Sequence, residues 1–593
     1  MSNKVFRLIL VAVTLYPSVS SHSQPGSSIS IEHNVVMKTR DGVALRADVY
    51  RPEGDGPFPV LLERTPYNKQ NETESARQAA GHGFMVVLQD VRGRYESDGE
   101  WYPFKHEIED GYDTVEWAAA LPHSNGKVGM FGGSYVGATQ MLAAISHPPH
   151  LAGICPLVTA SNYHENWTYQ GGAFEQWFNE SWTSGLAQDT VDRAVKAGSN
   201  AMEGRMVLPL KKYPLYNMHL DADPADWTAR FAPYFLDWLD HPSYDSYWKK
   251  WAIEEQYASI QVPALTTAAW YDIFQGGSLR NYMGLKASAG NPAARAGQRL
   301  LVIIGGHAGG GAKIGDVEFG PEALFDYNAE MIAWYEYLFL GKQNEFATEK
   351  PVKLFVMGEN KWRYEDDWPL KRARNTKYLL HSCGNANSSS GSGLLYTGQQ
   401  EFRCENQDGY TYDPANPVPT VGGPLCCDPA HLPAGPRDQS EVEKRKDVLV
   451  YSTEALTADT EVTGPVMLDL FARASTVDTD FTAKLVDVWP NGFAQNLTEG
   501  ILRARFRNGT AAAEPLEPGK IYEYKIDLWS TSNVFLKGHK IRLEISSSNF
   551  PRFDRNLNTG KDAASSSDFV KSDISIYHDG AHPSALLLPV VPR

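Results

Sequence analysis

Several features that define protein classes are scarce in this chain of 593 residues. Its five cysteines match no common metal-binding spacing, which argues against a zinc site. Acidic residues outnumber basic ones by 71 to 55 and no basic tract stands out, so nucleic acid is not an expected partner. After the N-terminal segment no stretch is apolar enough to span a membrane, and no internal repeat has a fixed period. What remains is a globular composition, 42% hydrophobic and 21% charged, long enough for two or three domains.

The few cysteines are unevenly placed. Cys155 lies in the apolar run 153–158 and is expected to be a buried core thiol. The other four fall in a later, loop-rich stretch: Cys383, Cys404, Cys426 and Cys427. An even set in an exported protein is compatible with disulfides, and the sequence leaves their pairing open.

The N-terminal segment has the layout of an export signal. Lys4 and Arg7 precede the apolar run 8–16, and small residues follow at 18–23. The apolar run is too short to cross a bilayer as a helix. We therefore expect residues 1–23 to be a signal peptide and the protein to be exported, to the periplasm or the medium.

The first half of the chain alternates short β-branched runs with helical patterns. An Asp-Gly turn at 41–42 predicts a hairpin of residues 35–39 and 43–50. Further strands are predicted at residues 59–62, 84–88, 128–131, 153–158, 263–268 and 300–304. Helical patterns at 108–121 and 138–146 separate some of them. Strands alternating with helices predict an α/β domain with a largely parallel sheet, which we place at residues 30–345.

Two regions depart from this alternation. Residues 160–258 contain seven of the 15 tryptophans and predict a helical insertion. Most of its aromatic residues are expected to pack its own core, and a few would line an apolar acyl pocket if it caps the site. Residues 350–593 are rich in loops and in alternating runs, which predict a β-sandwich with strands at 448–451, 466–472, 482–488, 501–506, 522–528 and 541–545.

Residues 127–140 have the layout of a nucleophile elbow, in which a strand turns sharply into a helix around a serine. The usual pattern is G-x-S-x-G. Here Val136 stands where the second glycine is expected, and Gly137 follows one residue later. By itself the pattern is equally compatible with an ordinary loop, so the candidate nucleophile Ser134 depends on finding its partners elsewhere in the chain.

Partners are found at two other strand ends. His307 follows the strong strand signal 300–304 on a glycine-rich loop, where a general base is expected. Asp272 ends the apolar run that starts at 263. The order Ser134, Asp272, His307 is that of α/β-hydrolases. Asp90 also follows a strand but precedes the serine, so we expect it to form structural ion pairs with Arg92 and Arg94.

With these residues in place, the chain resembles the cocaine esterase and X-prolyl dipeptidyl aminopeptidase group of serine hydrolases, which includes α-amino-acid ester hydrolases. The resemblance covers most of the chain after the signal, and Gly137 fits the family's G-x-S-Y-x-G elbow. Three motifs carry the resemblance most clearly: Arg-Thr-Pro-Tyr-Asn-Lys at 64–69, Gln-Asp-Val-Arg-Gly-Arg at 89–94 and Trp-Tyr-Asp at 270–272. Further similar stretches are residues 98–99, 129–137, 464–466, 478–481, 518–519, 538–543 and 547–551.

The resemblance implies an α/β-hydrolase domain with a helical cap, followed by a jelly-roll-like β-sandwich domain. It also implies an oxyanion hole made of the Tyr67 hydroxyl and the Tyr135 backbone N–H. One feature departs from the family, whose histidine usually follows a Gly-Pro-Trp context. Gly305 and Gly306 precede His307 here, so leaving-group preference does not carry over.

The expected activity is hydrolysis of a carboxylic ester through an acyl-serine, with a small ester or a short peptide or amide as substrate. No metal or organic cofactor is expected, and homo-oligomerisation is left open. The alternatives are an X-prolyl dipeptidyl peptidase or an α-amino-acid ester or amide hydrolase. Either would need an acidic group to hold a substrate ammonium, and the insertion offers candidates at Glu165, Glu175, Glu180 and Asp189. A remote alternative is a non-catalytic protein that binds carbohydrate or a surface.

Overall fold

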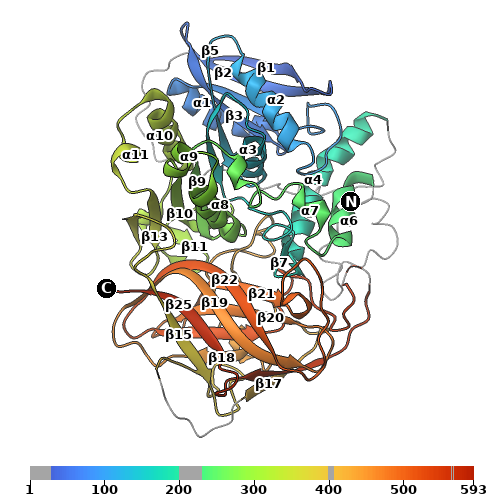
Figure 1. Ribbon diagram of the computed structural model, residues 1–593, viewed down its shortest axis with the longest axis vertical. Helices are drawn as coiled ribbons and strands as arrows, with labels where there is room; N and C mark the ends of the chain where they lie inside the picture. Colours follow the sequence, from blue (N-terminus) through green and yellow to red (C-terminus); the bar gives the residue numbers. More distant parts are fainter. Residues whose placement is uncertain (1–28, 199–229, 399–406, 563, 565) are drawn as a thin grey trace, which may run out of the picture.

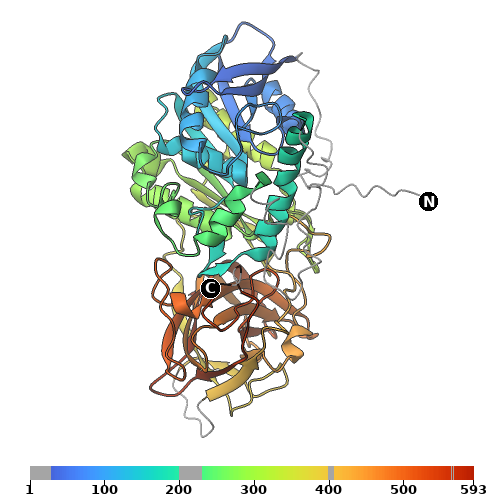
Figure 2. The same ribbon diagram turned by 90° about the vertical axis from the view of Figure 1, so that its right-hand side faces the viewer.

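The computed structural model describes residues 29–198, 230–398, 407–562, 564 and 566–593. The predicted signal peptide and the middle of the predicted insertion lie outside these residues. The described chain forms an α/β unit and a sheet-rich unit, stacked along the long axis of the molecule (Figures 1 and 2). Within the described ranges, no helix combines the length and the apolar character that a membrane crossing requires.

The α/β unit is built on a ten-stranded sheet with the order β1-β2-β4-β3-β5-β6-β9-β10-β13-β14. Pairing is parallel from β4 to β13 and antiparallel at both edges. All predicted strands of this half are present. The strands are β1 (Ile29–Lys38), β2 (Ala44–Pro52), β3 (Phe58–Thr65), β4 (Met85–Asp90), β5 (Ser124–Gly133), β6 (Leu151–Leu157), β9 (Leu265–Tyr271), β10 (Arg299–Gly306), β13 (Val352–Val356) and β14 (Lys361–Glu365).

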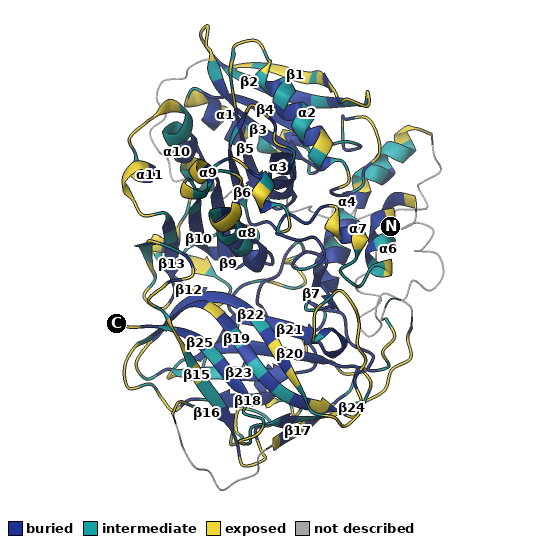
Figure 3. Cartoon of the chain, in the orientation of Figure 1, coloured by how far each residue is buried: buried dark blue, intermediate teal, exposed yellow. Residues whose placement is uncertain are grey.

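Helices cover both faces of this sheet, which is why central strands such as β4 and β9 are buried along their whole length (Figure 3). The helices are α1 (Thr73–Gly81), α2 (Glu107–Ala119), α3 (Tyr135–Ile145), α8 (Gln275–Ser288), α9 (Pro292–Ala296), α10 (Tyr327–Leu340) and α11 (Glu345–Thr348). The short strands β11 (Lys313–Ile314) and β12 (Val317–Glu318) form a separate hairpin.

The first sheet ends later than the expected domain boundary near residue 350. Strands β13 and β14 still belong to it, so by sheet membership the α/β unit reaches Glu365. Leu354 and Phe355 of β13 are fully buried. The loss of helical periodicity after residue 350 therefore reflects an antiparallel hairpin that completes the first sheet, and the second unit begins after it.

The described part of the insertion is helical and aromatic. It contains β7 (Tyr169–Gln170), β8 (Ala173–Phe174), α4 (Gln176–Lys196), α6 (Pro233–Asp240) and α7 (Ser246–Lys249). Trp167, Trp238 and Trp248 are fully buried. Their rings belong to one network of stacked and edge-to-face contacts, which is how large aromatic side chains fill a core.

The second unit is an eleven-stranded sheet whose ladders are antiparallel except between β16 and β18. Its strands are β15 (Arg374–His381), β16 (Leu394–Tyr396), β17 (Gln407–Tyr412), β18 (Leu449–Ser452), β19 (Thr460–Ala474), β20 (Asp480–Val488), β21 (Ala494–Arg503), β22 (Tyr522–Phe535), β23 (Lys540–Ser546), β24 (Ser572–Tyr577) and β25 (Ala585–Val591). One buried apolar cluster spans both units, joining Leu300 and Phe355 to Leu468 and Leu528. The two units therefore share a core.

Candidate active site

Ser134 lies at the sharp turn between β5 and α3. Its φ of 60° and ψ of −126° fall in a backbone region that residues other than glycine rarely adopt. Two hydrogen bonds hold the turn: the Ser134 N–H donates to the Leu157 carbonyl at 2.9 Å, and the Ser134 carbonyl accepts from the Ala138 N–H at 3.1 Å. The serine is only 5% exposed and stands at the carboxyl end of β5. This is the conformation that the elbow pattern predicts.

The late glycine of the elbow has a packing explanation. A Cβ on Gly137 would lie 2.8 Å from the Thr159 Cβ, so only glycine lets α3 approach the chain after β6 this closely. Val136 meets a different constraint, because a Cβ on Gly132 would lie 2.3 Å from its Cγ1. The valine side chain packs directly against Gly132. The position at which only glycine fits between α3 and the chain after β6 is therefore residue 137 instead of residue 136.

Two side chains bind the backbone just before the nucleophile. The Gly132 N–H donates to the Tyr327 hydroxyl at 3.3 Å, and Gln140 Nε2 donates to the Gly132 carbonyl at 2.9 Å. Gln140 Oε1 also accepts the Cys155 N–H at 2.9 Å. Cys155 is buried as predicted, and burial raises the pKa of its thiol to about 12. This thiol is therefore an inert part of the core.

The three candidate triad residues meet at the carboxyl edge of the first sheet. Each follows a parallel strand: Ser134 follows β5, Asp272 follows β9 and His307 follows β10. His307 Nε2 lies 2.9 Å from Ser134 Oγ, and His307 Nδ1 lies 2.7 Å from Asp272 Oδ2. The Asp272 side chain is fully buried, and that of His307 is 10% exposed. The imidazole thus stands between the hydroxyl and the carboxylate.

The loop that carries His307 is a tight glycine turn. The N–H and carbonyl groups of Gly306 and Gly309 exchange hydrogen bonds of 3.2 and 3.1 Å. Gly305 has a φ of 153°, and a Cβ there would lie 2.3 Å from the Gly309 carbonyl oxygen. This backbone-paired turn directly precedes and follows His307, so the imidazole is carried by a short, closed loop.

Tyr67 points its hydroxyl at Ser134, the candidate nucleophile. Its oxygen lies 3.3 Å from Ser134 Oγ and accepts a hydrogen bond from Trp182 Nε1 at 3.1 Å. The backbone N–H of Tyr135 also favours the ionised form of this phenol. Burial raises the pKa of Tyr67, and these hydrogen bonds only partly offset that effect, so the phenol keeps its proton at neutral pH. Because the Trp182 N–H donates to the Tyr67 oxygen, the hydroxyl hydrogen of Tyr67 is free to donate.

The Tyr135 side chain has a separate structural role. Its hydroxyl donates to Glu107 Oε1 at 2.9 Å and accepts the Phe104 N–H at 2.7 Å. Only the backbone of Tyr135 faces the site.

The ion pairs predicted for Asp90 form with different partners. Asp90 accepts the Lys69 N–H at 2.9 Å and lies 4.0 Å from the Lys69 ammonium, while burial raises the pKa of Asp90 to about 6. Arg92 pairs instead with Asp41 and Asp110. The prediction of Asp90–arginine pairs was therefore wrong, because the loop brings Lys69 to that carboxylate.

Arg94 connects the Tyr67 loop to the insertion. It is fully buried and donates to the Pro66 carbonyl at 2.9 Å and to the Leu186 carbonyl of α4 at 2.7 Å. It also lies 3.6 Å from Asp189. Helix α4, which carries Trp182, is thereby tied to the residue that precedes Tyr67.

Aromatic rings pack beside the candidate triad, one from the turn after Asp272 and others from the insertion. The Phe274 ring packs edge-on against the His307 imidazole at 5.2 Å and stacks on Trp167 at 4.5 Å. Trp182 packs against Trp167 and Phe178. The roles of Trp182 and Phe274 are missed by the sequence reasoning, because no motif singles out Trp182 among the aromatic residues of the insertion or Phe274 after Asp272.

The acidic residues of the insertion mostly have partners of their own. Glu165 accepts the Gly171 N–H at 2.8 Å, and Glu175 lies 3.5 Å from Arg552 of the second unit. Burial raises the pKa of Glu180 to about 8 and that of Glu175 to about 7. Glu180 is therefore largely neutral at neutral pH.

The later cysteines form disulfides where the structure describes them. Cys426 and Cys427, adjacent in sequence, are joined to each other, and Cys383 is also disulfide-bonded. Cys404 lies outside the described residues. Cys426 packs into the apolar cluster that contains Trp167 and Trp182.

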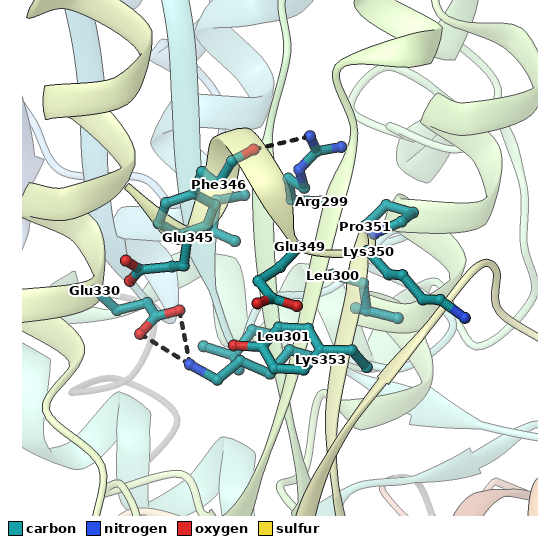
Figure 4. A pocket seen from close by; sticks show the side chains of 12 residues that line it. Arg299, Leu300, Leu301, Glu330, Glu345, Phe346, Glu349, Lys350, Pro351 and Lys353 are labelled. Atoms are coloured by element: carbon teal, nitrogen blue, oxygen red, sulfur yellow. Dashed lines mark hydrogen bonds and ion pairs between the residues drawn. The ribbon is translucent and has the colours of Figure 1, made fainter. Parts of the chain in front are cut away.

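A charged pocket lies at the opposite edge of the first sheet (Figure 4). Leu265 and Arg299, the first residues of β9 and β10, line it together with Lys353, whose ammonium lies 3.2 Å from Glu330. Asp272 and His307 follow the opposite, carboxyl ends of β9 and β10, so this pocket is separate from the candidate triad.

Comparisons with known proteins cover nearly the whole chain. Residues 41–309 match the family model described as X-Pro dipeptidyl-peptidase (S15 family). Residues 344–587 match the model of the X-Pro dipeptidyl-peptidase C-terminal non-catalytic domain. The cocaine esterase of Rhodococcus sp. (strain MB1 Bresler) is 38% identical over 95% of this chain and 99% of its own length.

Two solved structures share the fold at lower identity. An aminopeptidase from a marine sediment archaeon of the Thaumarchaeota superposes with a TM-score of 0.79 at 24% identity, covering 97% of this chain and 99% of its own. An α-amino acid ester hydrolase superposes with a TM-score of 0.77 at 22% identity, covering 97% and 100%. The match to the esterase over the full length, together with both family models, shows that the chain belongs to the cocaine esterase and X-prolyl dipeptidyl-peptidase family of serine hydrolases.

Proposed function

We propose that this protein hydrolyses carboxylic esters through a covalent acyl-Ser134 intermediate. The observation that carries the proposal is the continuous path from Ser134 Oγ through the His307 ring to Asp272, with contacts of 2.9 and 2.7 Å. A serine hydroxyl becomes a useful nucleophile when an oriented base removes its proton.

In the first half-reaction, Ser134 Oγ attacks the ester carbonyl carbon while His307 Nε2 takes its proton. The carbonyl oxygen becomes an oxyanion, which we assign to the Tyr67 hydroxyl and the Tyr135 N–H as donors. When the intermediate collapses, the C–O bond to the alcohol breaks and the alcohol leaves with the proton from Nε2. Asp272 holds the ring tautomer and stabilises the imidazolium.

In the second half-reaction, His307 deprotonates a water molecule, which attacks the acyl-serine carbonyl. The same two donors hold the second oxyanion. Collapse releases the carboxylic acid and returns the proton to Ser134 Oγ.

We infer that the acyl group is apolar or aromatic. The Phe274, Trp167 and Trp182 rings around the triad favour such a group, and the relative at 38% identity is a cocaine esterase. A peptidase or amino-ester hydrolase needs a charged carboxylate for the substrate ammonium. Glu165, Glu175 and Asp189 have N–H or arginine partners, and Glu180 is largely neutral, so these residues favour the ester.

The test compares aryl esters of increasing acyl length with a glycyl-prolyl anilide on the full chain. Ester turnover that rises with acyl size and is lost in Ser134→Ala supports the proposal. Labelling by a fluorophosphonate, read by intact mass, should add one group to the wild type and none to that variant. Preferred cleavage of the anilide would assign the protein to the peptidase alternative, and turnover by Ser134→Ala would overturn the nucleophile.

We also propose that residues 1–23 direct export to the periplasm or the medium. The support is the basic, apolar and small-residue order of this segment. N-terminal sequencing of the protein from cell fractions tests this: a start after about residue 23 outside the cytoplasm supports export. An intact N-terminus that is retained in the cytoplasm contradicts it.

A further inference from the structure

The turn that carries Asp272 lies between the two units of the molecule. Asp272 follows β9, and Gln275 begins α8 three residues later. Asp272 Oδ1 accepts the Phe274 N–H at 2.7 Å, and the Asp272 carbonyl accepts the Gln275 N–H at 3.1 Å. The direction of the carboxylate is therefore set by the conformation of this short turn.

The Gln275 side chain crosses from this turn to strand β22 of the second unit. It is 1% exposed. Its Oε1 accepts the Ser530 N–H at 3.0 Å, and its Nε2 donates to the Ser530 carbonyl at 2.7 Å and to the Trp270 carbonyl at 3.0 Å. One buried amide thus joins the last part of β9 to both backbone groups of a residue in the other sheet.

Strand β22 is shaped for this contact. The register of β19 against β22 shifts next to Pro465, the strand partner of Ser530, and Trp529 in the shifted stretch has a φ of 63°. Pro465 has no N–H to offer across the ladder. Gln275 thus bonds both backbone groups of the residue that lies opposite this proline.

Two further contacts bind the same turn to the second unit. The Tyr271 hydroxyl, next to the triad acid, donates to the Asn496 carbonyl at 2.9 Å and accepts from Gln495 Nε2 at 3.3 Å. A Cβ on Gly276 would lie 2.9 Å from Trp529 Nε1, so α8 begins in close contact with β22. Contacts with the second unit therefore hold the turn before Asp272, at Tyr271, and after it, at Gln275 and Gly276.

We propose that Gln275 and Tyr271 are positioning residues through which the C-terminal unit aligns Asp272 with His307. The inference rests on the proposed function, in which Asp272 orients the imidazole. Neither side chain touches the reacting atoms. Each acts through the turn, and small displacements of a catalytic group lower turnover steeply. The region that matches a non-catalytic domain model then contributes to catalysis by geometry.

The test uses Gln275→Met in the full-length protein, because methionine keeps the length of the side chain and removes its hydrogen bonds. We expect kcat to fall about 10- to 100-fold at nearly unchanged KM. The low-field proton signal of the His307–Asp272 hydrogen bond, observed with isotope-labelled histidine, should shift or broaden. A purely structural role would lower stability without changing that signal in the folded enzyme.

The matched control is Gln298→Met. Gln298 is also 1% exposed and donates to two backbone carbonyls, those of Ala294 at 2.7 Å and Val262 at 3.3 Å. Its kcat and its histidine signal should equal those of the wild type. A fall in kcat as large as that in Gln275→Met would contradict the positioning role.

A second variant, Tyr271→Phe, removes one hydroxyl from the same turn and should lower kcat in the same direction by about 2- to 10-fold. If Gln275→Met fails to fold, the kcat and the histidine signal of Tyr271→Phe test the positioning role by themselves. Wild-type kcat and signal in every folded variant, with Ser134→Ala inactive, would overturn the positioning role. Turnover by Ser134→Ala would instead overturn the proposed function.

Discussion

In the part of the chain that the structure describes, a serine, a histidine, an aspartate and a tyrosine meet in each of the two units. The second cluster lies in the C-terminal unit around Asp408 of β17, toward the end of the molecule away from the first sheet (Figure 1). Asp408 Oδ1 accepts from Ser382 Oγ at 2.6 Å. Its Oδ2 accepts from the Tyr451 hydroxyl at 2.8 Å and lies 3.1 Å from His578 Nε2. All four side chains are buried.

The difference between the clusters is which group stands in the middle. At the first sheet the imidazole of His307 lies between the serine and the carboxylate, so it has a hydroxyl proton to accept. In the C-terminal cluster the carboxylate is central and accepts from its neighbours. Among the described contacts none joins His578 to Ser382, so Ser382 remains a donor to Asp408. The same residue types therefore suit a nucleophile in one order and a structural anchor in the other, which is the role we propose for each cluster.

The largest expected effect separates the two serines. Ser134→Ala should lower kcat by about 10⁴-fold or more, because it removes the nucleophile. Ser382→Ala should leave kcat unchanged and lower only the melting temperature. Ester hydrolysis and thermal unfolding of both variants test the comparison. A folded but inactive Ser382→Ala would contradict the assignment of Ser382 as a structural residue.

The two aspartates come next. Asp272→Asn should lower kcat by about 10³- to 10⁴-fold, because an amide favours the wrong imidazole tautomer. Asp408→Asn should keep kcat and destabilise the fold by about 3 kcal/mol, since it removes the negative charge and turns one of the two acceptor oxygens into an amide donor that faces buried donors. Steady-state kinetics and urea unfolding measure these changes. Equal losses of kcat in the two folded variants would contradict the comparison.

The two tyrosines are expected to differ in the same way with a smaller effect. Tyr67→Phe should lower kcat/KM by about 10²- to 10³-fold through loss of an oxyanion donor. Tyr451→Phe should keep kcat/KM and cost about 1 kcal/mol of stability. If Tyr67→Phe hydrolyses esters at the wild-type rate, the oxyanion assignment is wrong.

The smallest expected effect is a pH dependence of stability. Burial raises the pKa of Asp408, but hydrogen bonds from His578, Ser382, the Ala386 N–H and Tyr451 outweigh it, and the net pKa is lowered. A carboxyl whose pKa is lower in the folded state stabilises the fold above its unfolded value, about 3.9, and loses that contribution as pH falls through the folded value.

Urea unfolding of the wild type and of Asp408→Asn at several pH values checks this sign. The difference in unfolding free energy should be constant from pH 7 down to about pH 4 and should shrink below that. A difference that grows as pH falls would show that Asp408 is not stabilised as the anion.

Local patterns were sufficient for much of the catalytic half. The strands around the candidate triad are short apolar runs, and the elbow has small residues where the backbone must turn. Strands β5, β9 and β10 were therefore predictable, and so were Ser134 and Asp272, which directly follow β5 and β9. His307 followed because parallel strands present their carboxyl ends at one edge. Only the resemblance pointed to Tyr67, since a tyrosine after proline is otherwise an ordinary turn residue.

Other features depend on contacts between distant parts of the chain, which periodicity does not reveal. Lys69 as the partner of Asp90, Trp182 as the donor to Tyr67 and the Gln275–Ser530 contact each require two segments to be packed before the pair exists. The assignment of β13 to the first sheet is of the same kind, because a short apolar run fits either sheet equally well.

The sequence by itself determined the elbow and the order of the triad, because backbone strain, small residues and strand ends are local properties. Only the tertiary structure decided that His307 stands between its partners whereas Asp408 stands in the middle of its own cluster. Composition is identical in the two clusters, and what separates them is which side chain the packed fold places between the others.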